Sequence, residues 1–141
     1  GASHGISVSS AGDVNADGLM DVVIGSKFIA RVYLGDLASG VKQAPIEIVG
    51  NTAAFADSVA GLGDTNRDGH DDILIGATDQ DNASLFLGDL TGVPTIASKT
   101  IYADGDAPGY GFSVAQLWGT GADNLWNRRQ NPPGLSLRIR L

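Results

Sequence analysis

The chain has 141 residues, of which 43% are hydrophobic and 18% are charged, and its formal net charge is −7. This balance excludes a disordered chain, and no apolar run reaches the roughly 18 residues that a membrane-spanning helix needs. The acidity disfavours nucleic acid as a partner. The absence of cysteine excludes disulfides, thiolate metal sites and a cysteine nucleophile.

Eight short strands are predicted along the chain. They are rich in β-branched residues or alternate in polarity, and most end at glycine and aspartate, which favour turns. The first four predicted strands span residues 6–11, 22–24, 30–34 and 46–49. The next four span residues 58–62, 73–75, 83–87 and 98–102. The scarcity of glutamate, methionine and glutamine argues against long helices.

The second set of strands repeats the first. Residues 7–25 share their serine, valine, aspartate, asparagine and glycine pattern with residues 58–76, which lie 51 positions later. A third copy opens at residues 110–115. Four short strands in this length are typical of a propeller blade. We therefore predict an all-β, incomplete β-propeller with blades of four antiparallel strands; a two-sheet sandwich with a fortuitous repeat is the alternative.

The repeat predicts three segments: a first blade at residues 1–54, a second at 55–109, and the start of a third followed by an aberrant tail at 110–141. The third copy lacks the acidic pattern of the first two. Residues 1–115 carry 15 acidic and 5 basic side chains, whereas residues 116–141 carry one acidic and four basic side chains. This change indicates a frameshifted or appended sequence after residue 115, with a native basic tail as the alternative.

Two acidic loops carry the chemistry that the sequence predicts. We call residues 13–21 the first acidic loop and residues 64–72 the second acidic loop. Positions 1, 3, 5 and 9 of the loops hold Asp13, Asn15, Asp17 and Asp21, then Asp64, Asn66, Asp68 and Asp72. Position 6 is glycine in both loops, and position 7, Leu19 or His70, can offer only a carbonyl oxygen.

Calcium prefers six to eight hard oxygen ligands, which these positions can supply. Unlike the helix-loop-helix calcium motif, the loops have no glutamate at position 12 and run between strands. The alternative is plain turn chemistry, because aspartate and asparagine also bond their own backbone. Three close carboxylates repel one another unless a cation is present. We therefore predict two calcium ions per chain; Asp71, beside position 9, is expected to be a solvated neighbour.

These residues resemble the FG-GAP repeat, the blade unit of integrin alpha-subunit propellers and of related bacterial and fungal propellers. The resemblance covers residues 4–115, although the Phe-Gly and Gly-Ala-Pro signatures of the family are imperfect here. It implies calcium binding through the side chains named above, with Leu19 and His70 as carbonyl ligands. It also implies seven blades for closure, so we expect missing blades or self-assembly to complete the ring.

The sequence predicts a binding module and not an enzyme, because the recurring Ser7, Ser58 and Ser113 have no common histidine or lysine partner. The expected role is a calcium-stabilised extracellular scaffold for recognition or adhesion of a protein or glycan ligand, secreted or at the cell surface. A lectin-like, carbohydrate-binding propeller is the alternative. Millimolar calcium outside cells suits loops of modest affinity. No membrane insertion is expected.

Overall fold

The computed structural model describes residues 5–42, 44–102, 111 and 113–115. Within this part the regular secondary structure consists of antiparallel strands and one short 3₁₀ helix, η1 (Thr78–Gln80). The predictions made for the basic tail, and most of those for the third copy, lie outside the described residues.

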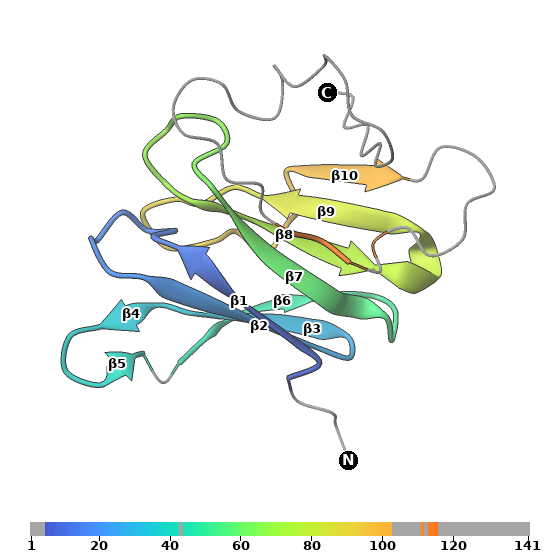
Figure 1. Ribbon diagram of the computed structural model, residues 1–141, viewed down its shortest axis with the longest axis horizontal. Helices are drawn as coiled ribbons and strands as arrows, with labels where there is room; N and C mark the ends of the chain where they lie inside the picture. Colours follow the sequence, from blue (N-terminus) through green and yellow to red (C-terminus); the bar gives the residue numbers. More distant parts are fainter. Residues whose placement is uncertain (1–4, 43, 103–110, 112, 116–141) are drawn as a thin grey trace, which may run out of the picture.

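The first sheet contains four antiparallel strands in the order β1-β2-β3-β6 (Figure 1). Its strands are β1 (Ser7–Gly12), β2 (Asp21–Ser26), β3 (Ile29–Tyr33) and β6 (Ile46–Val49). A two-stranded hairpin, β4 (Gly35–Asp36) with β5 (Gly40–Val41), is inserted before the last strand. The sequence did not predict this hairpin, because its strands are only two residues long and carry no apolar run.

The second sheet repeats the arrangement, with the order β7-β8-β9-β10 along the sheet (Figure 1). Its strands are β7 (Phe55–Gly63), β8 (Asp72–Ala77), β9 (Asn82–Phe86) and β10 (Lys99–Tyr102). All three pairings are antiparallel. The predicted fold class, all-β with propeller-type blades of four antiparallel strands, is therefore confirmed.

The core lies between the two sheets, where β7 packs against β1 and β2 (Figure 1). The β-branched runs that predict buried strands supply it: Val23, Ile73 and Ile75 have no exposed surface. Phe55 and Phe86 join this cluster from the second sheet, as do Val32 and Ile48 from the first. Burial of these side chains is the main force that holds the sheets together.

One contact recurs at each junction between units. The Ser7 hydroxyl donates a hydrogen bond of 3.0 Å to the carbonyl oxygen of Ala56, and the Ser58 hydroxyl donates one of 2.6 Å to that of Gly111. A Cβ atom added at Gly25 would overlap the Ala56 carbonyl oxygen, and one at Gly76 would overlap that of Gly111. The recurring serine and glycine therefore serve the junctions, and residue 111 repeats the role of residue 56.

Candidate metal centre

The two acidic loops occupy equivalent places in the two sheets. The first links β1 to β2, and the second links β7 to β8. In each case position 9, Asp21 or Asp72, is the first residue of the second strand of its sheet. The residues that the sequence selects thus occupy equivalent positions between the first two strands of each sheet.

The aspartate at position 1 closes each loop through its carboxylate. Asp13 accepts the N–H groups of Asp17 at 3.0 Å and Gly18 at 2.8 Å. Asp64 accepts the N–H groups of Asp68 at 3.1 Å and Gly69 at 2.9 Å. The matching bonds show that both sequences form the same turn.

Positions 3 and 5 bond to each other in the same way in both loops. The Asn15 amide donates to Asp17 at 2.9 Å, and the Asn66 amide donates to Asp68 at 2.7 Å. The Asn66 amide is the main reason that the pKa of Asp68 lies below its usual value, helped by the N–H of His70 at 2.9 Å. The carboxylate of Asp68 is therefore held in its charged form, which is the form that binds a cation.

Gly18 and Gly69 are required at position 6 by the backbone. Their φ angles are 86° and 92°, in the left-handed region that other residues rarely adopt. A Cβ atom would meet nothing within 4 Å at either position. The requirement is therefore conformational and not steric, as the sequence predicts.

The aspartate at position 9 is buried and fully hydrogen-bonded. Asp21 has no exposed surface and accepts the N–H groups of Val14 at 2.8 Å and Gly35 at 2.7 Å. Asp72 likewise accepts the N–H groups of Thr65 at 2.8 Å and Gly88 at 3.0 Å, together with the Thr65 hydroxyl.

Burial raises the pKa of both Asp21 and Asp72, and the backbone hydrogen bonds oppose that rise. Each of these carboxylates anchors its acidic loop to the start of the following strand and to a glycine beyond the third strand. Position 9 thus has a structural role in addition to the ligand role that the resemblance implies.

The donor set of the first acidic loop fits a hard cation. The Asn15 side-chain oxygen is buried and has no hydrogen-bond partner, which leaves an amide oxygen free to bind a metal. In the second loop the equivalent oxygen, on Asn66, accepts the Asp68 N–H at 3.1 Å. Within the described ranges, no three acidic or histidine side chains form a metal-binding group by themselves, so the amide and carbonyl oxygens would have to complete each site.

Leu19 and His70, the predicted carbonyl donors, lie half-buried at position 7. Their N–H groups bond the Asp17 and Asp68 carboxylates at 2.9 Å in both loops. If calcium binds, the chain's own residues would supply carboxylate, amide and carbonyl oxygens, and the ion would neutralise the repulsion between the carboxylates.

The sequence did not predict two side-chain contacts that the second acidic loop makes with the first. Asp71 is not a solvated neighbour, because its carboxylate accepts the Asp13 N–H at 2.9 Å. The His70 ring, for which the sequence offers no partner, lies 3.2 Å from the Val14 carbonyl oxygen through its Nδ1 atom. Both partners are more than 50 positions away in the chain, so no local pattern indicates the contacts.

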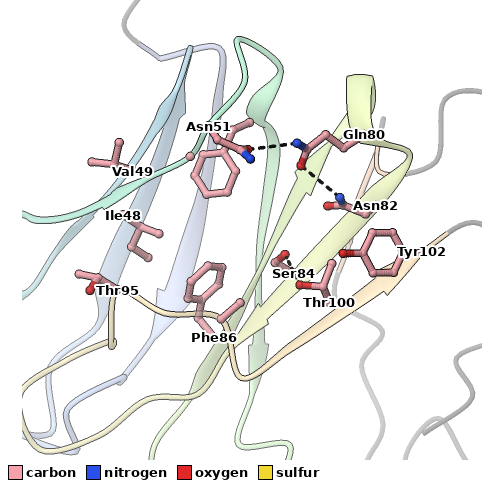
Figure 2. A pocket seen from close by; sticks show the side chains of 13 residues that line it. Ile48, Val49, Asn51, Gln80, Asn82, Ser84, Phe86, Thr95, Thr100 and Tyr102 are labelled. Carbon is pink, nitrogen blue, oxygen red and sulfur yellow. Dashed lines mark hydrogen bonds between the residues drawn. The ribbon is translucent and has the colours of Figure 1, made fainter.

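A pocket of about 340 Å³ lies between the outer strands of the two sheets (Figure 2). The Gln80 amide donates to Asn51 at 3.1 Å and accepts from Asn82 at 3.3 Å on one wall. Ser84 and Thr100 share a hydrogen bond of 3.0 Å on another, beside Tyr102. None of the residues that line this inter-sheet pocket is charged; its lining combines amide and hydroxyl groups with apolar side chains that include the buried Ile48 and Phe86.

Among the residues that the structure describes, no helix has the length and apolar character required to cross a membrane.

Comparison with known proteins places the sequence near integrin alpha subunits. It is 30% identical to human integrin alpha-6 over 116 residues, which are 73% of this chain and 10% of that protein. It is 29% identical to mouse integrin alpha-IIb over 138 residues, covering 79% of this chain and 13% of the relative. Integrin alpha pat-2 of Caenorhabditis elegans is 30% identical over 96 residues, or 59% of this chain and 8% of its own length.

No family model matches the chain. The chain spans about a tenth of the length of the curated relatives that it matches. Taken with the two repeated four-stranded sheets, these similarities show that the chain contains an integrin-alpha-like region with propeller-type blades.

Proposed function

We propose that this chain is a calcium-binding, FG-GAP-type propeller module that serves as an extracellular recognition or adhesion scaffold. Its units would be blades at residues 1–54 and 55–109, with a third beginning at residue 110. The observation that carries the proposal is that the position-1 aspartate closes both acidic loops with the same two backbone hydrogen bonds, from the N–H groups at positions 5 and 6. The similarity to adhesion-receptor subunits supports the same role.

Further blades are part of this proposal, because one face of the first sheet lacks a covering layer within the described residues. Val8 is 69% exposed, whereas its equivalent in the second unit, Val59, is 6% exposed. Ile6 and Met20 lie in the same unit and are 44% and 65% exposed. A preceding unit, from a longer chain or a second copy, would bury this apolar surface.

We propose one calcium ion in each acidic loop. The side-chain donors would be Asp13, Asn15, Asp17 and Asp21 in the first loop and Asp64, Asn66, Asp68 and Asp72 in the second. Leu19 and His70 would add carbonyl oxygens. The free Asn15 oxygen supports this assignment.

Removing position 5 of one loop should remove one site. We expect calorimetric titration to find two calcium ions bound by the unchanged chain and one by either Asp17→Ala or Asp68→Ala. Both carboxylates are exposed, so the loss of ligand charge should exceed any loss of fold. Asp36→Ala, which removes an aspartate outside the acidic loops, is the control and should keep both sites. Two sites in all three variants would contradict the assignment.

A carbohydrate-binding role is the second candidate function, and the inter-sheet pocket favours it. Its uncharged amide and hydroxyl groups can hydrogen-bond sugar hydroxyls, and Tyr102, which is 67% exposed, offers a ring face.

A glycan array in calcium buffer tests this candidate. The lectin role predicts specific glycan binding that falls at least about tenfold in Tyr102→Ala, the loss expected from a contact of about 1.4 kcal/mol. Leu90→Ala changes an exposed side chain that does not line the pocket and should bind normally. If no glycan binds, or if Tyr102→Ala binds as the unchanged chain does, this second function is refuted.

A further inference from the structure

The two acidic loops touch each other through Asp71. Its carboxylate accepts the N–H of Asp13 at 2.9 Å, and its own N–H donates to the carbonyl oxygen of Asp13 at 3.0 Å. Both backbone polar groups of Asp13, the first residue of the first acidic loop, are thus fixed by one residue of the second loop. A hydrogen bond to a carboxylate is stronger than one between neutral groups.

Two glycines beside this contact leave room for the close approach of the two loops. A Cβ atom added at Gly12 would overlap the Asp71 carboxylate. A Cβ atom added at Gly88 would crowd the carbonyl oxygens of both Asp71 and Val14. The His70 ring reaches the Val14 carbonyl oxygen beside them. The close approach of the two loops therefore depends on backbone space that two glycines provide.

Comparison of the two repeats shows that the residue at position 8 is not needed to close an acidic loop. Position 8 of the first acidic loop is Met20, which is 65% exposed and cannot accept a hydrogen bond as a carboxylate does. Both loops nevertheless close with the same internal hydrogen bonds. An aspartate at position 8 is therefore not needed to form a loop. In the second loop the Asp71 carboxylate instead hydrogen-bonds to the first acidic loop.

We propose that Asp71 is a positioning residue that orders the first acidic loop from the neighbouring sheet and so couples the two cation sites. The inference rests on the proposed calcium binding. Asp71 precedes Asp72 in its own loop and hydrogen-bonds to Asp13 of the first acidic loop. An ion that orders one loop therefore favours, through Asp71, the binding-competent conformation of the other loop. Such coupling is reciprocal: each ion raises the affinity for the other by the same factor.

Amide NMR tests the proposal in two steps on the full chain. Without calcium, hydrogen exchange at the Asp13 amide measures the Asp71 contact directly, and Asp71→Ala should speed it. Calcium is then titrated while the Gly18 and Gly69 amides report on the first and second loops separately. In Asp71→Ala the calcium concentration at the Gly18 midpoint should rise about fivefold or more, the lower end of typical coupling factors.

Asp71→Asn is the conservative control. It removes the charge but keeps an acceptor oxygen, so it should restore much of the Asp13 protection and of the Gly18 midpoint. It also serves if the alanine variant does not fold. Asp68→Ala, which disables the second loop, should weaken binding at Gly18, and this weakening should vanish when Asp71→Ala is already present.

Unchanged exchange at Asp13 in both Asp71 variants would overturn the proposal. So would an unchanged Gly18 midpoint, or an asparagine variant as weak as the alanine one, since charge alone would then explain the effect. Faster Asp13 exchange in Asp71→Ala, with no calcium response at either glycine in the unchanged chain, would refute calcium binding while upholding Asp71 as the residue that orders the first loop.

Discussion

Asp72→Ala is expected to lower the free energy of unfolding by about 3 kcal/mol, even with calcium removed by a chelator. The substitution removes the acceptor of the buried Gly88 N–H group and of the part-buried Thr65 N–H group, and a buried donor without a partner costs about 1–3 kcal/mol. Asp21→Ala should lower the free energy of unfolding by a similar amount, because it leaves the N–H groups of Val14 and Gly35 without their acceptor. Urea unfolding followed by circular dichroism measures both.

Asp17→Ala is the control for this effect. Asp17 is exposed and accepts its hydrogen bonds near solvent, so without calcium its loss should cost less than about 1 kcal/mol. Equal losses of stability in the Asp17 and Asp72 variants would show that position 9 does not anchor the loop as described.

Gly25→Ala is expected to lower the free energy of unfolding by about 3 kcal/mol, the upper range for overpacking a close contact. Its Cβ atom would overlap the Ala56 carbonyl oxygen, which already accepts the Ser7 hydroxyl at 3.0 Å. The sheets would have to separate at this junction, where β7 contributes Phe55, Ala56 and Val59 to the core. Gly76→Ala should weaken the equivalent contact with Gly111.

Gly40→Ala is the control that distinguishes the steric overlap at Gly25 from the general cost of replacing a glycine. Gly40 has a φ of 84°, and a Cβ atom there would meet nothing within 4 Å. Its replacement should cost about 1 kcal/mol through backbone strain alone. A Gly25 variant no less stable than the Gly40 variant would contradict the tight junction. Urea unfolding of the two proteins side by side gives the answer.

Much of the fold can be predicted from the sequence because its signals are local. The runs around Val23 and Ile75 are β-branched and apolar, and both prove to be buried strands. The glycine at position 6 of each acidic loop indicates its left-handed backbone directly. The repeat then extends each local inference to a second copy, which is why the eight predicted strands lie close to the observed ones.

The remaining features depend on contacts between distant residues. Asp71 reaches Asp13 across 58 positions, and comparison of the repeats sets it against Met20, which suggests an incidental difference. The inter-sheet pocket joins Asn51 to Gln80 in the same way, across 29 positions. The burial of Asp21 and Asp72 is also hidden in the sequence, since an aspartate in a loop pattern normally faces solvent.

The central claim is that the two acidic loops each bind a calcium ion and that the ions stabilise the blades. Calorimetric calcium titration of the full chain, with a thermal melt on the same sample, tests it most directly. We predict two ions bound per chain and a melting temperature that rises with calcium concentration, because ligand that binds only the folded state stabilises it. No binding heat at several temperatures, together with a melting temperature that calcium does not change, would contradict the claim.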